Sequence, residues 1–311
     1  MTINVLFAAH ESRWSQYQHP LQTAFEEAGI FGASLARDHA PELVDYIIYA
    51  PNSELQDFTP YTRCKAVLNL WAGVETAVGN PTLTQPFCRM ADPALTQGMV
   101  EWVCGHVLRH HLGMDAHILA KPGEWTPTPP PVSWDRKITV LGLGELGTAC
   151  AKQLATLGFQ THGWARSAKS VDAVTCHHGP GGLADALADA DGVVLLLPKT
   201  PATENTLNAR TLALMPKGAR ILNPGRGPLI DDDALLAALD AGQIGQATLD
   251  VFRVEPLPAD HPYWAHEKVT VTPHIASETR AETASEVIAE NIRRGEAGEP
   301  FLHLVDRDLG Y

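Results

Sequence analysis

The stretch KITVLGLGELGTACAKQLATLG, residues 137–158, decides the fold of this 311-residue chain. Its first five residues are mostly apolar and β-branched, which predicts a buried strand. Three glycines follow with the spacing Gly142-x-Gly144-x-x-Gly147, and the apolar residues after them recur as on one face of a helix. A strand, a glycine-rich turn and a helix in this order predict the first unit of a doubly wound α/β domain.

The glycine spacing predicts a binding site for a dinucleotide because it lies between a strand and a helix. Gly142 would make the turn tight, Gly144 would let the backbone approach a pyrophosphate, and Gly147 would let the helix pack on the strand. The helix N-terminus would offer N–H groups and the positive end of its dipole to the phosphates. The alternative is a tight turn that binds nothing.

Strands and helices alternate on both sides of this unit, which implies parallel strands joined by crossovers. From residue 137 onward we expect strands at KITVLG, FQTHGWA, GVVLLLP, ARILNP, QATLDVF and VTVTPHI, with helices over residues 146–157, 183–190 and 232–241. Before it we expect strands at residues 3–9, 46–49, 66–70 and 87–90, a helix at 21–28 and a long helix at 95–119, which the proline-rich loop 121–131 ends. A last helix is expected at 280–294. The predicted class is α/β with two doubly wound parallel-sheet domains, a Rossmann domain and a flavodoxin-like one.

Composition excludes several classes of protein. The net charge is −13 and no run of lysine or arginine occurs, so nucleic acid is not an expected partner. The five cysteines are widely spaced without a CxxC pair, which argues against a disulfide scaffold or a zinc site, and no metal is predicted. The N-terminus is interpreted as a strand and no apolar run is of membrane-spanning length, so we expect no membrane association and a reducing cytoplasm. The pairs His110–His111 and His177–His178 lack matched ligands and are interpreted as solvated or packing residues.

The second strand of the predicted Rossmann domain ends in HGWARSAKS, which places Arg166, Ser167 and Lys169 directly after it. A domain that selects NAD usually has Asp or Glu here, to bind the ribose 2′-hydroxyl. A guanidinium can instead hold a 2′-phosphate through two parallel hydrogen bonds. The segment therefore favours NADP(H), with NAD(H) possible; the alternative is a solvated basic loop.

Three later segments stand at strand C-termini, where ligands bind in open α/β sheets. They are NPGRG at 223–227, LDVFRVEP at 249–256 and TPHIA at 272–276. In the order GxGxxG, NxxRG, LDVFxxEP and TPHxA, the chain resembles the D-isomer-specific 2-hydroxyacid dehydrogenase family. The LWAGVE loop from Leu70, the arginine after the second strand and the closing VDRDLGY resemble the branch that reduces glyoxylate and hydroxypyruvate.

The resemblance implies NADPH-dependent reduction of a small 2-keto acid, with Arg226 binding the substrate carboxylate and carbonyl oxygen. His274 would be the general acid, and Glu255 would orient His274 and favour its protonated form. Backbone N–H groups of Ala72, Gly73 and Val74 would hold the carboxylate. The full set of expected substrate contacts is Trp71, Ala72, Gly73, Val74, Arg226 and His274. The expected cofactor contacts are Gly142, Gly144, Glu145, Leu146, Gly147, Arg166, Ser167, Lys169, Pro198 and Asp250, of which Asp250 would meet the nicotinamide carboxamide.

The resemblance also implies two domains that the chain crosses twice. Residues 1–96 with 276–311 would form the substrate domain, and residues 97–275 the coenzyme domain. The long helix at 95–119 would help to form a homodimer. Two alternatives stay open: a reductase of a bulkier 2-keto acid such as phenylpyruvate, and a nucleotide-sensing interaction protein similar to the corepressors of this fold.

Overall fold

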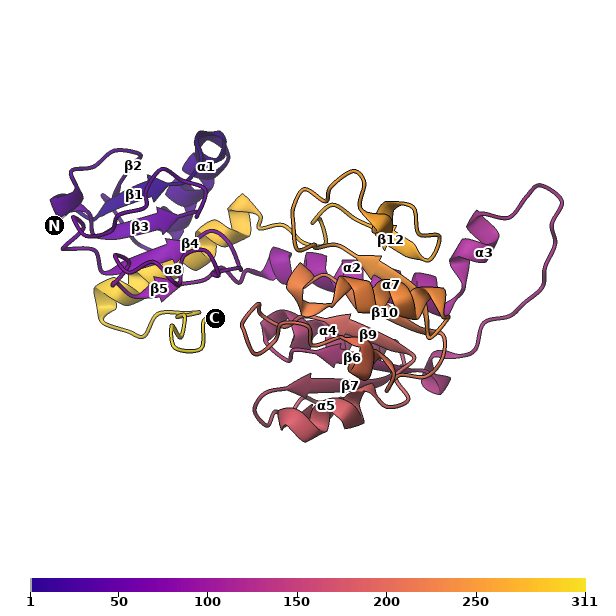
Figure 1. Ribbon diagram of the computed structural model, residues 1–311. Helices are drawn as coiled ribbons and strands as arrows, with labels where there is room; N and C mark the ends of the chain where they lie inside the picture. Colours follow the sequence, from indigo (N-terminus) through magenta and orange to yellow (C-terminus); the bar gives the residue numbers. More distant parts are fainter. Residues whose placement is uncertain (1) are drawn as a thin grey trace. The chain divides into compact units, whose positions relative to one another are not determined.

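The computed structural model describes residues 2–311 and divides into two compact units. Unit 1 comprises the chain up to Leu95 together with Glu278–Tyr311, and unit 2 comprises Thr96–Ser277. Each unit is built on its own parallel sheet, so the predicted α/β class with two parallel sheets is confirmed (Figure 1). No helix within residues 2–311 is long and apolar enough to cross a membrane.

Unit 1 has a five-stranded sheet in the order β2-β1-β3-β4-β5, with every neighbouring pair parallel. Alternate residues of a strand face opposite sides, so strand Tyr46–Tyr49 sends Tyr46 and Ile48 into one apolar core and Ile47 and Tyr49 into the other. Helices α1 and α8 cover the first of these faces. The elements are β1 (Asn4–Ala8), α1 (Glu11–Glu27), β2 (Ser34–Ala36), η1 (Pro41–Leu43), β3 (Tyr46–Tyr49), β4 (Ala66–Asn69), β5 (Phe87–Cys88) and α8 (Ala281–Ala297).

Unit 2 has a seven-stranded parallel sheet in the order β12-β11-β10-β9-β6-β7-β8. The strand order reverses beside β6, so the carboxyl end of β6 lies at the switch point where such sheets bind ligands. Apolar cores fill both faces of the sheet, and α2 and α4 contribute to the same one. The elements are α2 (Pro93–His111), α3 (Met114–Ile118), η2 (Ser133–Asp135), β6 (Lys137–Leu141), α4 (Glu145–Thr156), β7 (Gln160–Ala165), β8 (Thr175–His178), α5 (Gly179–Leu187), β9 (Gly192–Leu195), α6 (Ala209–Leu212), β10 (Ala219–Asn223), η3 (Gly227–Leu229), α7 (Asp232–Asp240), β11 (Ile244–Leu249), η4 (Pro262–Trp264) and β12 (Val269–Val271).

The structure corrects several sequence-based expectations. Helix α5, expected at 183–190, begins and ends earlier, at Gly179–Leu187. The first helix begins ten residues earlier than expected, at Glu11, because Tyr17 continues the buried face of Leu21 and Phe25 despite Pro20 within the helix. The predicted helix over 95–119 is two helices, because Gly113 between them adopts a φ of +63°. Strands β2 and β8 were missed because both are short edge strands without a buried face. The one-turn helix α6 was missed because it is too short to show a period.

Candidate active site

The turn between β6 and α4 has the shape that a dinucleotide requires. A Cβ atom on Gly142 would lie 2.5 Å from the carbonyl oxygen of Leu196, and Gly142 has a φ of +107°. A Cβ on Gly147 would lie 1.7 Å from the carbonyl oxygen of Gly142, so the turn and the first turn of α4 pack too closely for any side chain. A Cβ on Gly144, in contrast, would meet nothing within 4 Å.

The open space at Gly144 lies at the N-terminus of α4, where Gly144 itself is the N-cap and no side chain caps the helix. A phosphate needs such a place, because N–H groups and the positive end of the helix dipole then face it without competition from a side chain. The residues of this turn therefore fit the diphosphate of a dinucleotide. Glu145 and Leu146 begin the helix directly after it.

The basic loop after β7 lies beside this turn. Strands β6 and β7 are parallel neighbours in which Leu141 is paired with Trp164, and the N–H of Gly142 donates to the carbonyl of Trp164 at 2.8 Å. Arg166 follows β7 by one residue, and Arg166, Ser167 and Lys169 are all exposed. The glycine turn and the basic side chains thus leave the sheet at the same edge, as the ribose and diphosphate of one ligand would require.

His274 and Glu255 form a hydrogen-bonded pair at the carboxyl edge of the same sheet. The His274 Nδ1 lies 2.7 Å from Glu255 Oε2, and the other carboxylate oxygen of Glu255 accepts from the N–H of Phe252 at 2.9 Å. Glu255 is therefore held from both sides, and the ring of His274 is fixed through Nδ1. The His274 side chain is 52% exposed, so Nε2 stays available to a ligand.

The loop that carries His274 is tied down by Asp250, the residue that follows β11. The Asp250 side chain is fully buried and accepts from the hydroxyl of Thr272 at 2.5 Å and from the N–H groups of Ile275 and Ala276 at 2.9 Å each. The N–H of His274 donates to the carbonyl of Asp250 at 2.8 Å. These bonds hold the backbone of His274 at a φ of +53°. A residue other than glycine keeps such a left-handed conformation only where its surroundings fix it. The predicted contact of Asp250 with a carboxamide stays a prediction.

Arg226 stands between two glycines that lie very close to other backbone segments. A Cβ on Gly225 would lie 2.7 Å from the carbonyl oxygen of Leu195, and one on Gly227 would lie 2.0 Å from the carbonyl carbon of Phe252. Gly225 therefore lets the NPGRG loop pack against the end of β9, and Gly227 lets it pack against the segment that leads to Glu255. Arg226 is half-buried and its guanidinium donates to the carbonyl of Gly225 at 2.6 Å.

Asn223 fixes this loop as well, although the sequence analysis assigned it no role. Its buried amide donates to the carbonyl of Arg226 at 2.9 Å and accepts from the N–H of Gly225 at 3.2 Å. On the next strand of the sheet, Pro198 stands three residues after β9, and its carbonyl accepts from the hydroxyl of Thr203 at 2.6 Å.

In unit 1, the loop after β4 has Trp71 39% exposed and Val74 buried in the apolar core. Within the part of the chain that the structure describes, the N–H groups of Ala72, Gly73 and Val74 have no hydrogen-bond acceptor. Successive backbone N–H groups that donate to no protein acceptor can together bind an anion. The loop therefore suits a carboxylate without any cationic side chain.

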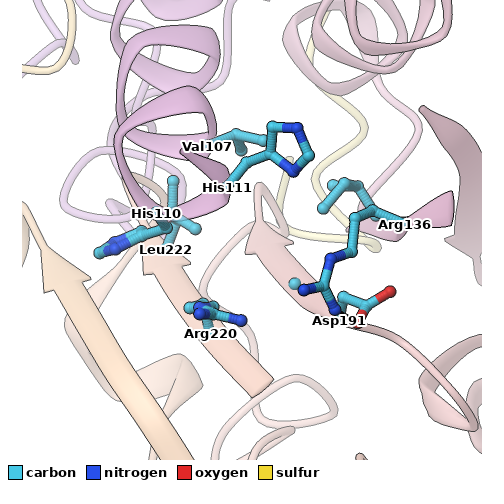
Figure 2. Close-up of a pocket in the computed structure, with 9 residues that line it drawn as sticks. Val107, His110, His111, Arg136, Asp191, Arg220 and Leu222 are labelled. Carbon is cyan, nitrogen blue, oxygen red and sulfur yellow. Dashed lines mark hydrogen bonds and ion pairs between the residues drawn. The ribbon is translucent and has the colours of Figure 1, made fainter. Parts of the chain in front are cut away.

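A small cavity of unit 2 lies elsewhere, at the amino ends of β6, β9 and β10, whereas the site residues stand at carboxyl ends (Figure 2). Its volume of about 20 Å³ is that of about one water molecule. Arg136 and Asp191 form an ion pair at 2.6 Å in its wall. His110 beside it is a packing residue: it is 4% exposed, and burial lowers its pKa to about 4.

Comparison with known proteins now identifies the chain. A family model, "D-isomer specific 2-hydroxyacid dehydrogenase, NAD binding domain", matches residues 105–276. The chain belongs to the D-isomer-specific 2-hydroxyacid dehydrogenase family. It is therefore an oxidoreductase that uses NAD(P), and the motifs recognised in its sequence are those of this family.

Individual members of the 2-hydroxyacid dehydrogenase family resemble the chain over most of its length. Glyoxylate/hydroxypyruvate reductase A of Serratia proteamaculans (strain 568) is 38% identical over 257 residues, which cover 80% of this chain and 82% of the relative. A D-isomer-specific 2-hydroxyacid dehydrogenase from Xanthobacter autotrophicus Py2, solved with NADPH and MES, is 39% identical over all of both chains, with a TM-score of 0.93. An NADPH-dependent glyoxylate/hydroxypyruvate reductase from Sinorhizobium meliloti, solved with NADP and sulfate, is 30% identical over all of both chains, with a TM-score of 0.87.

Proposed function

We propose that this enzyme is an NADPH-dependent reductase of a small 2-keto acid, such as glyoxylate or hydroxypyruvate. The observation that carries the proposal is the pair of His274 and Glu255, joined at 2.7 Å while the histidine side chain stays 52% exposed. Reduction of a ketone needs a proton donor at the carbonyl oxygen, and a histidine oriented through Nδ1 offers Nε2 for that purpose.

In the proposed reaction, His274 donates the proton from Nε2 to the carbonyl oxygen of the substrate. The bound nicotinamide supplies the hydride. Glu255 offsets the charge of the imidazolium before the transfer and keeps the neutral ring in place afterwards, because Nδ1 still donates to its carboxylate. Asp250 fixes the backbone on both sides of His274, so the ring does not have to be ordered when the substrate binds.

Two groups of this chain would bind the substrate carboxylate. One group is formed by the backbone N–H groups of Ala72, Gly73 and Val74. The other is Arg226, whose guanidinium would donate to both the carboxylate and the carbonyl oxygen from separate N–H groups in its plane. Trp71, the exposed aromatic residue of the same loop, would contact the substrate beside them. A guanidinium near the carbonyl oxygen also stabilises the negative charge that develops there.

For the cofactor we propose NADP(H) over NAD(H). Gly142, Gly144, Glu145, Leu146 and Gly147 would hold the diphosphate, and Arg166, Ser167 and Lys169 would hold the 2′-phosphate. Pro198 and Asp250 would lie toward the nicotinamide. The proposal is supported by the absence of an acidic residue among the exposed positions directly after β7. It is also supported by the two solved relatives, which carry NADPH and NADP.

We further propose that unit 1 is the substrate domain, unit 2 is the coenzyme domain, and the enzyme is a homodimer. Support for the dimer comes from the segment after α2, in which large apolar side chains are exposed and which extends away from the sheet of unit 2 (Figure 1). Exposed apolar groups on this scale are typical of association surfaces. These residues are Ile118, Leu119, Trp125 and Trp134, which are 69%, 80%, 91% and 62% exposed.

The decisive experiment is the oxidation of NADPH, followed at its absorbance, with glyoxylate, hydroxypyruvate and phenylpyruvate, repeated with NADH. We expect the highest kcat/KM with NADPH and one of the two small acids. Higher kcat/KM with phenylpyruvate would favour the reductase of a bulkier acid. No turnover with any acid, together with tight nucleotide binding, would favour the nucleotide-sensing interaction protein.

A further inference from the structure

One buried side chain of unit 1, Asn69, shapes the loop that we propose for the substrate carboxylate. Asn69 is the last residue of β4 and is 1% exposed. Its Nδ2 donates to the carbonyl of Trp71 at 2.8 Å and to the carbonyl of Gly73 at 3.0 Å. The two N–H bonds of one side-chain amide thus donate to the carbonyl groups of residues 71 and 73 in the same loop.

Other carbonyl groups of this loop also accept hydrogen bonds from neighbouring residues of unit 1. The carbonyl of Leu70 accepts from the hydroxyl of Thr279 at 3.1 Å, and the carbonyl of Val74 accepts from the N–H groups of Ala77 and Val78 at 2.9 Å. The carbonyl of Trp71 accepts a second bond, from the N–H of Met90 at 3.0 Å. The carbonyl groups of Leu70, Trp71, Gly73 and Val74 are therefore satisfied within unit 1, while the N–H groups of residues 72–74 donate to no acceptor in the described chain.

A trans peptide unit connects these two facts, because its C=O and its N–H point in opposite directions. When Asn69 draws the carbonyl of Trp71 toward itself, the N–H of Ala72 must point away from Asn69. When Asn69 draws the carbonyl of Gly73, the N–H of Val74 must do the same. One amide side chain thereby aims two of the three proposed carboxylate donors.

A second observation indicates that the NH₂ group of Asn69, and not its Oδ1 atom, is the part of the side chain that matters for the loop. Its Oδ1 is buried and has no hydrogen-bond partner among residues 2–311. An unsatisfied buried oxygen is costly, so this position is poorly suited to an asparagine unless the NH₂ group gives a compensating benefit. The NH₂ group has both of its bonds on the loop.

We infer that Asn69 is a positioning residue for 2-keto acid binding, which sets the backbone N–H groups of residues 72–74 toward the substrate carboxylate. The inference rests on the proposed function, because it presupposes that this loop binds the carboxylate. Asn69 does not itself touch the substrate.

The test is Asn69→Asp, which keeps the size of the side chain and replaces the NH₂ donor by a carboxylate oxygen. That oxygen repels both carbonyl groups, so the peptide units turn and the aimed N–H groups are lost. We expect KM for glyoxylate to rise about 10- to 100-fold, the range for losing one charge-assisted hydrogen bond or more. The dissociation constant for NADPH, measured by its fluorescence, should stay within about twofold, since the loop belongs to unit 1.

The pH profile separates positioning from a general structural role. A protonated aspartic acid regains an O–H donor, and a buried carboxyl group without a cationic partner has a raised pKa. The ratio of the KM of Asn69→Asp to that of the wild type should therefore fall as pH is lowered. Asn69→Ala, which lacks both the donor and the charge, should show a raised KM whose ratio to the wild type does not depend on pH. It also keeps the inference testable if the aspartate variant does not fold.

Asn291→Asp is the matched control. Asn291 lies on α8 of the same unit, is 2% exposed, and donates from Nδ2 to the carbonyl of Leu302 at 3.4 Å. We expect it to lower the thermal midpoint without raising KM. A folded Asn69→Ala with the wild-type KM would overturn the inference. If the wild type itself reduces no 2-keto acid, it is the proposed function that fails.

Discussion

Burial of His110 makes a quantitative prediction about the pH dependence of stability. His110 lies on α2 and is 4% exposed, with its ring between Gln246 Oε1 at 3.0 Å and Thr248 Oγ1 at 2.8 Å. Burial is the largest cause that lowers its pKa, from 6.5 to about 4, and the positive charges of Arg109 and Arg220 add to it. The hydrogen bond with Gln246 raises the pKa and is the second-largest cause, and Asp115 raises it more weakly, but neither outweighs burial.

Linkage gives the sign and the size of the effect. In the unfolded chain the ring takes up a proton near pH 6.5, whereas in the folded protein it stays neutral until pH is near 4, so the unfolded state binds more protons between these values. Stability contributed by His110 is therefore fully present above pH 6.5 and is lost as pH falls through this window. The loss amounts to about 2 kcal/mol at pH 5 and about 3 kcal/mol at pH 4.

The assay compares urea unfolding of the wild type and of His110→Gln at pH 7, 6, 5 and 4. Other groups titrate in both proteins, so the difference between their free energies of unfolding isolates His110. That difference should shrink by about 2 kcal/mol between pH 7 and pH 5. His19→Gln, which removes an exposed histidine of α1, is the control and should follow the wild type. If His110→Gln and the wild type lose stability in parallel, His110 ionises in the folded protein as it does in the unfolded chain.

The remaining predictions concern the proposed site and assembly. His274→Ala should lower kcat on the order of 10²–10⁴-fold with little change in NADPH binding, and an alanine variant with near-wild-type turnover would remove His274 from the mechanism. Arg226→Lys keeps the charge but loses the fork geometry, so KM for glyoxylate should rise sharply and kcat should fall; unchanged kinetics would mean that the carboxylate is held elsewhere. Arg166→Asp should lower kcat/KM for NADPH by about 10- to 150-fold or more at low salt and improve NADH relative to it, whereas a wild-type preference for NADH would contradict our interpretation of Arg166. Light scattering at micromolar concentration should give the mass of a dimer, and a monomer mass would refute that proposal.

Long apolar patterns were the part of the fold that sequence could predict. The strands at β1, β3, β4, β6, β7 and β10 lie within a residue or two of their expected positions, because each is apolar enough to be buried on at least one face. Strands β9 and β11 were also found, but each ends three residues earlier than expected. Edge strand β8 carries Thr-Cys-His-His and has no such pattern, so only its pairing with β7 reveals it. On this strand, Nε2 of His177 lies 2.9 Å from Nδ1 of His162 on β7. No local sequence pattern indicates this contact between the two strands.

The sequence by itself determined the order of the motifs, and with it the family and the identity of the candidate site residues, because residue type and spacing along one chain carry that information. Tertiary structure alone decided how those residues are held. The two bonds that Asp250 makes to the N–H groups of Ile275 and Ala276, and the packing of Gly227 against Phe252, join positions about 25 residues apart. Likewise the role inferred for Asn69 depends on which way two peptide units turn. Peptide orientation and long-range hydrogen bonds are fixed only when strands pack side by side, and no pattern of residues records them beforehand.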